Sequence, residues 1–292
     1  ITGILAGTLT GLIPGIHINL IAALIISNAL YLSNAIDQLS LALFIISLTI
    51  SHIFLDFVTT SFLGSPESDS LLAIMPANKL LVQGRGYEAV RLSALGSLIG
   101  ILAIGIFALP IYYLSKSVYP ALASYLPIIL SLASIILILK EKSSKLTALI
   151  IFLLSGVLGI TAFTMPNLKQ PLLPLLSGLF GASSLILNIK QNTKITEQST
   201  TTEKINHKAS VKFLAASFFS TILTSFFPGL TSSETAMLST SILRKTDTRS
   251  YLLMLGSISS MSTMISMIAM FSIFKVRSGS IAAIQSIMTS LN

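Results

Sequence analysis

The sequence predicts an all-α protein that crosses a membrane several times and contains two similar repeats of opposite orientation. Three observations lead to this prediction: an apolar composition, long runs without charge, and two segments broken by the same Pro-Gly dipeptide. Only 10% of the 292 residues are charged and 53% are hydrophobic, whereas an ordinary soluble domain has about 25% charged residues. This composition excludes a soluble enzyme, a nucleic-acid-binding domain and a disordered chain.

Six apolar runs are long enough to cross a bilayer, which takes about 20 residues in a helix. The chain starts at Ile1 with an apolar run and without the basic residues that open a signal peptide, so we expect N-terminal sequence to be missing. The predicted spans are 39–62, 92–115, 120–139, 146–165, 172–189 and 250–274.

Two further apolar regions do not fit single spans. Residues 1–33 are interrupted by Pro14-Gly15 and residues 211–243 by Pro228-Gly229. Either region would be about 50 Å long as one helix, whereas the hydrocarbon core is about 30 Å thick. Because Pro disfavours helix in the residue before it and Gly permits a turn, each region is predicted to be a re-entrant hairpin with the Pro-Gly at its tip.

The basic residues predict the orientation of the spans in the cell membrane. Fourteen of the 18 Lys and Arg residues lie in four loops that are separated by even numbers of predicted crossings. Cytoplasmic loops are enriched in Lys and Arg, which also accounts for the net charge of +8 without a nucleic-acid partner. The loops predicted to be cytoplasmic are 79–91, 140–145, 190–212 and 244–249.

The polar segment 190–210 is rich in Thr, Lys, Gln and Asn and has almost nothing to bury, which is typical of a linker. It divides the chain into two membrane halves. The predicted organisation is a first repeat at 1–115 (hairpin 1–33, span 39–62, loop 63–91, span 92–115), connecting spans at 116–189, a cytoplasmic linker at 190–210, and a second, inverted repeat at 211–292.

The two hairpins align with each other. Placing Gly7–Asn19 over Thr221–Ser233 pairs Thr10 with Thr224 and superposes the two Pro-Gly dipeptides. Five predicted crossings separate the hairpins, and because five is odd the hairpins enter from opposite sides. Inverted repeats with broken helices are typical of secondary transporters. The alternative is that Pro-Gly occurs twice by chance and merely kinks two packed helices.

A broken helix in a membrane leaves amides and carbonyls that lipid cannot satisfy, so such a tip is expected to line a polar cavity. Helix N-termini offer amides to an anion and C-termini offer carbonyls to a cation. The residues predicted to line a substrate-binding cavity at the two tips are Gly11, Pro14, Gly15, His17, Asn19, Pro228, Gly229, Thr231, Ser232 and Ser233.

Two carboxylates inside apolar runs are candidates for ion coupling, because a charge at mid-bilayer costs at least about 2.5 kcal/mol. Asp56 lies one turn before Thr59 and Thr60, so the three can share a helix face. Glu234 follows the second Pro-Gly by five residues. The expected coupling ion is Na⁺ or H⁺, and no other cofactor is expected. The alternative for each carboxylate is a structural, hydrogen-bonded role, with His52 as a partner for Asp56.

Three other segments carry polar residues of interest. Ser65 lies in the turn-forming run Gly64–Asp69, expected to break the helix opposite the first tip or to be a plain surface loop; Glu67 and Asp69 there would repel an anion. Lys275 and Arg277 lie on the predicted external side, against the positive-inside trend, so either the predicted topology is wrong there or they recruit an anion. QGRGYEAVRL (83–92) is expected to be a cytoplasmic amphipathic turn and helix whose charges, Arg85, Glu88 and Arg91, are solvated or at lipid headgroups.

Several ordered motifs resemble a known family. GTLTGLIPGIHINL, then FLGSPESDSLLAIMPANKLLVQGRGYEAVRLSALGSLIG, and a second region at 220–285 resemble the TctA family, the large membrane subunit of tripartite tricarboxylate transporters. The likeness is closest to the archaeal branch, whose function is unknown. The resemblance implies a secondary transporter and leaves the substrate open.

The sequence thus predicts an ion-coupled secondary transporter of a small organic anion, a carboxylate, working by alternating access. The rival is a translocase for a lipid-linked anion such as polyprenyl phosphate. An intramembrane enzyme and a structural membrane subunit also remain, but the chain has no P-loop, no G-x-S-x-G, no H-E-x-x-H and no Cys. The expected partners are the lipid bilayer and the anionic substrate or phosphate headgroup; a homo-oligomer stays open.

Overall fold

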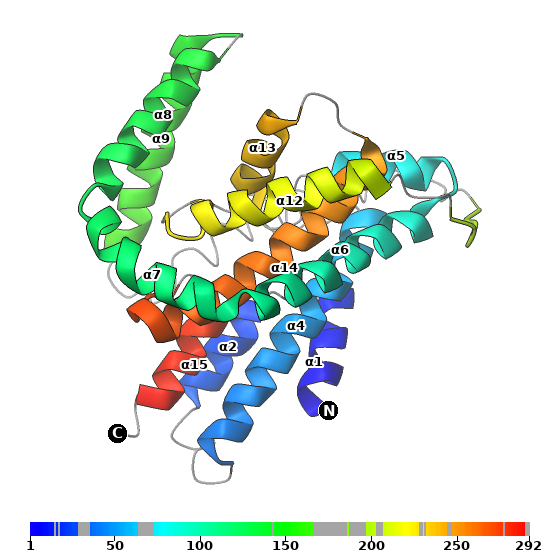
Figure 1. Cartoon of the computed structure of the whole chain (residues 1–292), viewed down its shortest axis with the longest axis horizontal. Helices are drawn as coiled ribbons and strands as arrows, with labels where there is room; N and C mark the ends of the chain where they lie inside the picture. Colours follow the sequence, from blue (N-terminus) through cyan, green and yellow to red (C-terminus); the bar gives the residue numbers. More distant parts are fainter. Residues whose placement is uncertain are drawn as a thin grey trace. The chain divides into compact units, whose positions relative to one another are not determined.

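The computed structural model describes helices throughout and, within the described residues, no strand (Figure 1). The residues that the structure describes are 1–14, 16, 18–28, 36–63, 73–141, 143–165, 186, 197–202, 207–227, 230, 232–243, 247–276 and 278–289. The helices are α1 (Thr2–Leu12), α2 (Ile18–Ser27), α4 (Gln38–Leu63), α5 (Ile74–Val82), α6 (Gly86–Ile106), α7 (Ala108–Ala123), α8 (Leu126–Lys140), α9 (Lys145–Thr164), α12 (His207–Thr224), α13 (Ser232–Ile242), α14 (Thr248–Ile273) and α15 (Gly279–Thr289).

Among the described residues, four helices are long and apolar enough to cross a membrane: α4, α6, α9 and α14. Helix α7 and the first part of α8 pass the same test together, with a bend of 75° between them, and would make a fifth span. Helices α1, α12 and α15 are apolar but shorter. The chain is therefore a multi-pass membrane protein.

The observed helices agree with the predicted spans 39–62, 146–165 and 250–274, which correspond to α4, α9 and α14. The predicted spans 92–115 and 120–139 differ, because α6 starts earlier and ends at Ile106, and α7 continues to Ala123. Pro110 and Pro127 explain the two breaks, since each lies in the first turn of a new helix, where proline's missing N–H is not needed. The predicted span 172–189 falls outside the described residues apart from Ile186.

The chain divides into two compact units. The smaller, Val118–Asn192, contains α8 and α9, which contact each other. Most side chains of α9 are exposed although they are apolar, for example Leu146 (68%) and Ile160 (68%). Such a surface suits contact with lipid tails rather than water.

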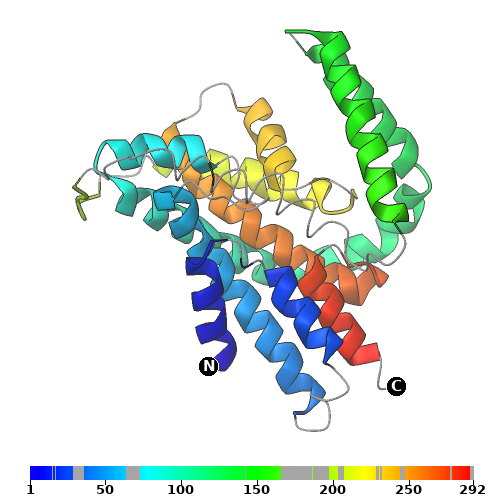
Figure 2. The same cartoon turned by 180° about the vertical axis from the view of Figure 1, so that it is seen from behind.

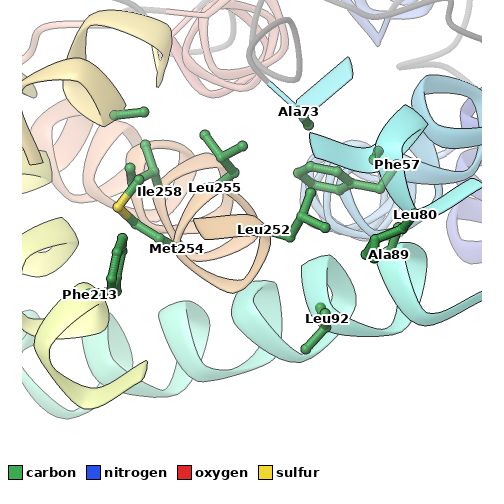
Figure 3. Packing of buried hydrophobic residues seen from close by; sticks show 12 residues of the cluster. Phe57, Ala73, Leu80, Ala89, Leu92, Phe213, Leu252, Met254, Leu255 and Ile258 are labelled. Atoms are coloured by element: carbon green, nitrogen blue, oxygen red, sulfur yellow. The ribbon is translucent and has the colours of Figure 1, made fainter. Parts of the chain in front are cut away.

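The larger unit, Ile1–Ser117 with Thr193–Asn292, is arranged around α14. Most residues of α14 are buried, and α6 and α12 contact it most extensively within the described helices (Figures 1 and 2). Figure 3 shows the main core, in which Phe57 of α4 and Leu92 of α6 surround Leu252 of α14, while Phe213 of α12 lies beside Met254.

Helices α6 and α14 approach each other closely and run parallel. A Cβ atom added to Gly96 would lie 1.9 Å from the carbonyl oxygen of Leu253, and one added to Gly256 would lie 2.0 Å from that of Ser93. The hydroxyl of Ser97 donates to the Gly256 carbonyl (3.0 Å) and that of Ser260 donates to the Ser97 carbonyl (2.9 Å). Small residues and interhelical hydrogen bonds are what hold helices together in lipid.

Helix α1 packs on α4 through glycines. Gly3, Gly7 and Gly11 of α1 lie against the backbone carbonyls of Phe44, Leu48 and His52 of α4, in the same order along both helices, so the two run parallel. In the second half, the hydroxyls of Ser210 and Ser217 on α12 pair with those of Ser250 and Ser257 on α14 (3.3 and 2.9 Å). Helices α12 and α14 therefore run parallel as well.

The two long helices run antiparallel to each other. The C-terminal part of α4, at Phe57, belongs to the same buried cluster as Leu252 near the start of α14. The N-terminal part of α4, at Leu41 and Ala42, clusters with Met270 near the end of α14. The pair α1–α4 therefore has the opposite direction to the pair α12–α14.

Both long helices have 26 residues and begin with the same cap. The carboxylate of Asp37 accepts a hydrogen bond from the amide of Ser40 (3.0 Å), and that of Asp247 accepts one from the amide of Ser250 (3.1 Å). Bonds from the Ser40 side chain and amide hold the pKa of Asp37 below its usual value. These caps satisfy amides that the helix start leaves free, and they lie at opposite ends of the antiparallel pair.

The short helix after each long helix contacts the other half. Ile281, Ile284 and Ile287 of α15 share a buried cluster with Ala22 of α2. Ala77 of α5 belongs to the cluster that contains Ala236 of α13. Helix α2 thus packs with α15, the helix that follows the long span of the opposite half, while α5 and α13 share a buried cluster with α14.

Candidate functional site

The end of α1 faces a buried polar cluster on α4. We call these residues the first tip cluster: Thr10, His52, Asp56, Thr59 and Thr60. The Thr10 hydroxyl lies 3.0 Å from Nδ1 of His52, and so links the last turn of α1 to α4. Because glycines bring α1 onto the α4 backbone, this polar side chain reaches the middle of a membrane-length helix.

Asp56 is the acidic member of the first tip cluster and is 7% exposed. The Thr59 hydroxyl donates to the backbone carbonyl of Asp56 (2.8 Å) and lies 3.5 Å from its carboxylate. Thr60, the next residue, is 1% exposed. The prediction that Asp56, Thr59 and Thr60 share one face of the helix agrees with this burial.

The end of α12 and the start of α13 carry a cluster of hydroxyls. We call these residues the second tip cluster: Ser220, Thr224, Ser225, Ser232, Ser233 and Thr235, all buried. The hydroxyls of Thr224 and Thr235 lie 2.7 Å apart, so the last turn of α12 contacts the first turn of α13. Sequence reasoning included Ser232 and Ser233 but missed Ser220 and Ser225, although the alignment of Thr10 with Thr224 pointed to this turn.

Four buried hydroxyls in this half have no hydrogen-bond partner within the described residues: those of Ser220 and Ser225 and, on α14, those of Ser266 and Ser272. Buried polar groups are nearly always hydrogen-bonded in proteins, and each exception needs an explanation. Sequence reasoning also missed Ser266, because a serine in a serine-rich helix carries no signal of its own.

Other predicted site residues have structural contacts. Gly11 lies against α4, where an added Cβ would be 2.9 Å from the His52 carbonyl oxygen. Asn19 is half-buried and its side-chain oxygen accepts a hydrogen bond from the amide of Ser280 (3.2 Å), so it caps the first turn of α15. Pro14 is half-buried between α1 and α2.

Glu234 is exposed on the first turn of α13, whereas its neighbours Ser233 and Thr235 are buried. Lys275 is half-buried just after α14, and its amide donates to the carbonyl of Ala269 (3.4 Å). The remaining predicted residues lie outside the described part of the chain: Gly15, His17, Ser65, Glu67, Asp69, Pro228, Gly229, Thr231 and Arg277.

The prediction that Glu88 is solvated is wrong. Glu88 is 1% exposed, and its carboxylate is bound by the guanidinium groups of Arg85 and, at 2.7 Å, of Arg249. The reason is that α6 and α14 start side by side, which brings an arginine from a distant part of the chain onto the carboxylate. Two of the loops with the same predicted orientation, 79–91 and 244–249, therefore meet.

The linker also has more contacts than its composition predicted. The side-chain amide of Gln198 accepts from the Gly86 amide (2.8 Å) and donates to the Leu81 carbonyl (3.2 Å), while the Ser199 amide donates to the Gly84 carbonyl (2.8 Å). Gly84 has φ +74°, and a Cβ there would lie 2.8 Å from the carbonyl oxygen of Glu197. The glycines of the Gly84-Arg-Gly86 motif thus make room for the linker.

The comparisons with known proteins agree with the resemblance of the motifs. The family described as "Tripartite tricarboxylate transporter TctA family" matches residues 1–292. The uncharacterized protein MJ1079 of Methanocaldococcus jannaschii is 32% identical over 302 residues, which cover 100% of this chain and 73% of that protein. No solved structure matches the chain. The chain therefore belongs to the tripartite tricarboxylate transporter TctA family, a family of transporters and not of enzymes, as its motifs predicted.

Proposed function

We propose that the protein is an ion-coupled secondary transporter of a small organic anion, working by alternating access around the two predicted hairpins. One observation carries this proposal: in two helix pairs of opposite direction, the helix end before each Pro-Gly dipeptide lies at a cluster of buried polar residues. In transporters built this way, substrate and ion bind at such broken helices near the bilayer midplane.

Inverted repeats explain the internal correspondences of the larger unit. In each half a short helix runs parallel to the long helix that follows it and contacts it through small residues. The capping pairs Asp37–Ser40 and Asp247–Ser250 open the two long helices in the same way. Helices α5 and α15, which follow the two long helices, each share a buried cluster with helices of the other half. These agreements are difficult to obtain from two unrelated helix kinks.

The family name favours a carboxylate as the substrate, and the buried hydroxyls of the second tip cluster are suitable donors for it. Asp56, with Thr59 and Thr60, is the proposed ion-coupling group, because a carboxylate within a membrane-length helix requires a cation or proton nearby. Glu234 on α13 is a second coupling candidate, and Lys275 with Arg277 would attract the anion.

Transport by the purified protein tests this proposal. In proteoliposomes, uptake of labelled citrate or succinate should require an inward Na⁺ gradient or an inward proton gradient, and should fall to the background of protein-free liposomes when the gradient is absent. Uptake of neither carboxylate under either gradient would contradict the proposal. If labelled polyprenyl phosphate moves between leaflets instead, the protein is a translocase for a lipid-linked anion.

A further inference from the structure

We propose that the two tip clusters, as parts of the transporter proposed above, have different ligands. The second tip cluster, together with Ser266, binds a carboxylate group of the substrate, whereas the first tip cluster binds the coupling cation at Asp56. This inference rests on a comparison of equivalent positions in the two halves.

The first difference lies between the long helices. Superposing the capping residue Asp37 on Asp247 pairs Ser40 with Ser250, and the same register pairs Asp56 with Ser266. Both of these residues are buried, at 7% and 4% exposure. One half therefore has a negative charge where the other half has a neutral hydroxyl.

The second difference lies between α1 and α12. Aligning the two Pro-Gly dipeptides pairs the glycines of α1 with hydroxyl residues of α12: Gly3 with Ser217, Gly7 with Thr221 and Gly11 with Ser225. The glycines of α1 lie directly on the α4 backbone. On α12 the same face carries hydroxyls instead, so α12 brings hydrogen-bonding groups to its contact with α14.

The hydroxyls of α12 differ in how they are satisfied. Ser217 bonds to Ser257 (2.9 Å) and Thr221 bonds to the carbonyl of Ser217 (2.6 Å). Ser225, closest to the Pro-Gly dipeptide, has no hydrogen-bond partner in the described part of the chain. Continuing the register of the pairs Ser210–Ser250 and Ser217–Ser257 along the two parallel helices places Ser225 at the level of Ile265. The next residue is Ser266, whose hydroxyl is likewise without a partner among the described residues.

Ser266 is nine residues, and so about half a turn, beyond Ser257 on α14, which puts it at the level of Ser225 but on the side away from α12, in the position that Asp56 has in the first half. An acceptor at this level would satisfy either serine, since an unmade hydrogen bond of a buried group is costly. Ser232, Ser233 and Thr235 add hydroxyls from the first turn of α13, where helix amides carry partial positive charge. That charge disfavours a cation and favours a carboxylate. Of the described residues in this turn, the one acidic side chain, Glu234, is exposed, whereas the hydroxyls are buried.

The first tip cluster has the opposite preference. Asp56 would repel a carboxylate through the low dielectric of the protein interior and would attract a cation. Hydroxyls of Thr59 and Thr60 lie next to it and can act as further oxygen ligands. The inverted halves thus provide one cation site and one carboxylate site from a common backbone plan.

Ligand-dependent thermal unfolding of the full chain in lipid nanodiscs tests this division. Citrate and Na⁺ should each raise the Tm of the unmodified protein, since a ligand that binds the folded state stabilises it. Ser225→Ala and Ser266→Ala should weaken the apparent Kd for citrate about tenfold, the effect of losing one hydrogen bond to a charged group, and should leave the response to Na⁺ unchanged. Asp56→Asn should remove the response to Na⁺ or, with proton coupling, the pH dependence of citrate binding.

Ser272→Ala is the matched control. Ser272 is also a buried serine of α14 whose hydroxyl has no partner among the described residues. It differs in lying near the C-terminal end of the helix, beyond the level of Ser225. It should change neither response. Unchanged citrate affinity in both serine variants, or a loss of the Na⁺ response in them, would overturn the assignment. A Tm that no carboxylate shifts would overturn it as well.

The outcomes separate this inference from the transport proposal. If citrate binds and the serine variants weaken it, but proteoliposomes show no flux, the binding assignment stands and the transport mechanism fails. If flux is present and the serine variants keep their KM, the transport mechanism stands and the assignment fails. Protection by polyprenyl phosphate instead of citrate would assign the hydroxyls to a lipid headgroup and overturn the carboxylate.

Discussion

At the scale of single residues, Glu88 determines how the start of α6 is fixed to α14. Its carboxylate is buried while the two arginines that bind it are about one-fifth exposed. A buried carboxylate is tolerated where opposite charges and hydrogen bonds compensate the loss of water. Here the two guanidinium groups come from both halves of the chain, so the charge cluster links them.

We expect Glu88→Ala to lower the free energy of unfolding by about 3 kcal/mol, because breaking a buried pair leaves the partner charges uncompensated. Glu88→Gln should lower it less, since the amide oxygen still accepts from one arginine. Chemical or thermal unfolding in detergent measures the effect. The exposed Glu141→Ala is the control and should change stability by no more than about 0.5 kcal/mol; equal effects of the two alanine variants would show that the cluster has no structural role.

At the scale of elements, the contact of α6 with α14 depends on glycines at positions where no larger side chain fits. Gly96 and Gly256 lie so close to the facing backbone that a methyl group has no room. Because backbone atoms cannot move aside as a flexible side chain can, the helices must separate to admit it. Separation would also lengthen the hydrogen bonds of Ser97 and Ser260.

Gly256→Ala should therefore destabilise the protein by about 3 kcal/mol or more, at the upper end of the cost of overpacking. Gly105→Ala is a matched control on α6, since an added Cβ there has nothing within 4 Å. It should be neutral or stabilising by up to about 1 kcal/mol, because alanine is the better helix former. Fluorescence-detected size-exclusion chromatography after heating measures the Tm of the two variants. A loss of stability in Gly105→Ala alone would refute the packing argument.

The elements themselves were largely predictable, whereas their contacts were not. Apolar runs bounded by Pro, Gly and charged residues located α4, α9 and α14, and Pro-Gly located the ends of α1 and α12. The break between α6 and α7 was missed because Pro110 lies inside an uninterrupted apolar run. The partner of Gly96 is Leu253, far away in the sequence, and in lipid both faces of a helix are apolar, so periodicity does not reveal the packed face.

The candidate site was predictable in part: its carboxylate could be found from the sequence, but its serines could not. Asp56 stood out because a charge in an apolar run is rare, and its burial was expected. Ser225 and Ser266 carry no such signal, because serine is common throughout this chain and its hydroxyl can bond to its own helix. Only the comparison of the two halves, which needs the helix registers, separates these two serines from the others.

At the scale of the larger unit, the charged loops and the linker come together at one end. Arg249 reaches Glu88, Gln198 bridges α5 and α6, and Arg91 donates to the hydroxyl of Thr202 (2.5 Å). Three of the four loops predicted to be cytoplasmic thus share contacts, which agrees with their facing the same compartment. The cap at Asp37 lies at the opposite end of the antiparallel pair.

Cysteine labelling measures this orientation directly, because the chain has no native cysteine. Glu197→Cys, in the linker, and Ile36→Cys, before α4, are both exposed positions. In intact cells a membrane-impermeant maleimide should label Ile36→Cys only, and after permeabilisation it should label both, since the positive-inside rule puts the linker in the cytoplasm. Labelling of both positions in intact cells would contradict the opposite placement of the two ends, and labelling of Glu197→Cys alone would invert the orientation while leaving the antiparallel repeats intact.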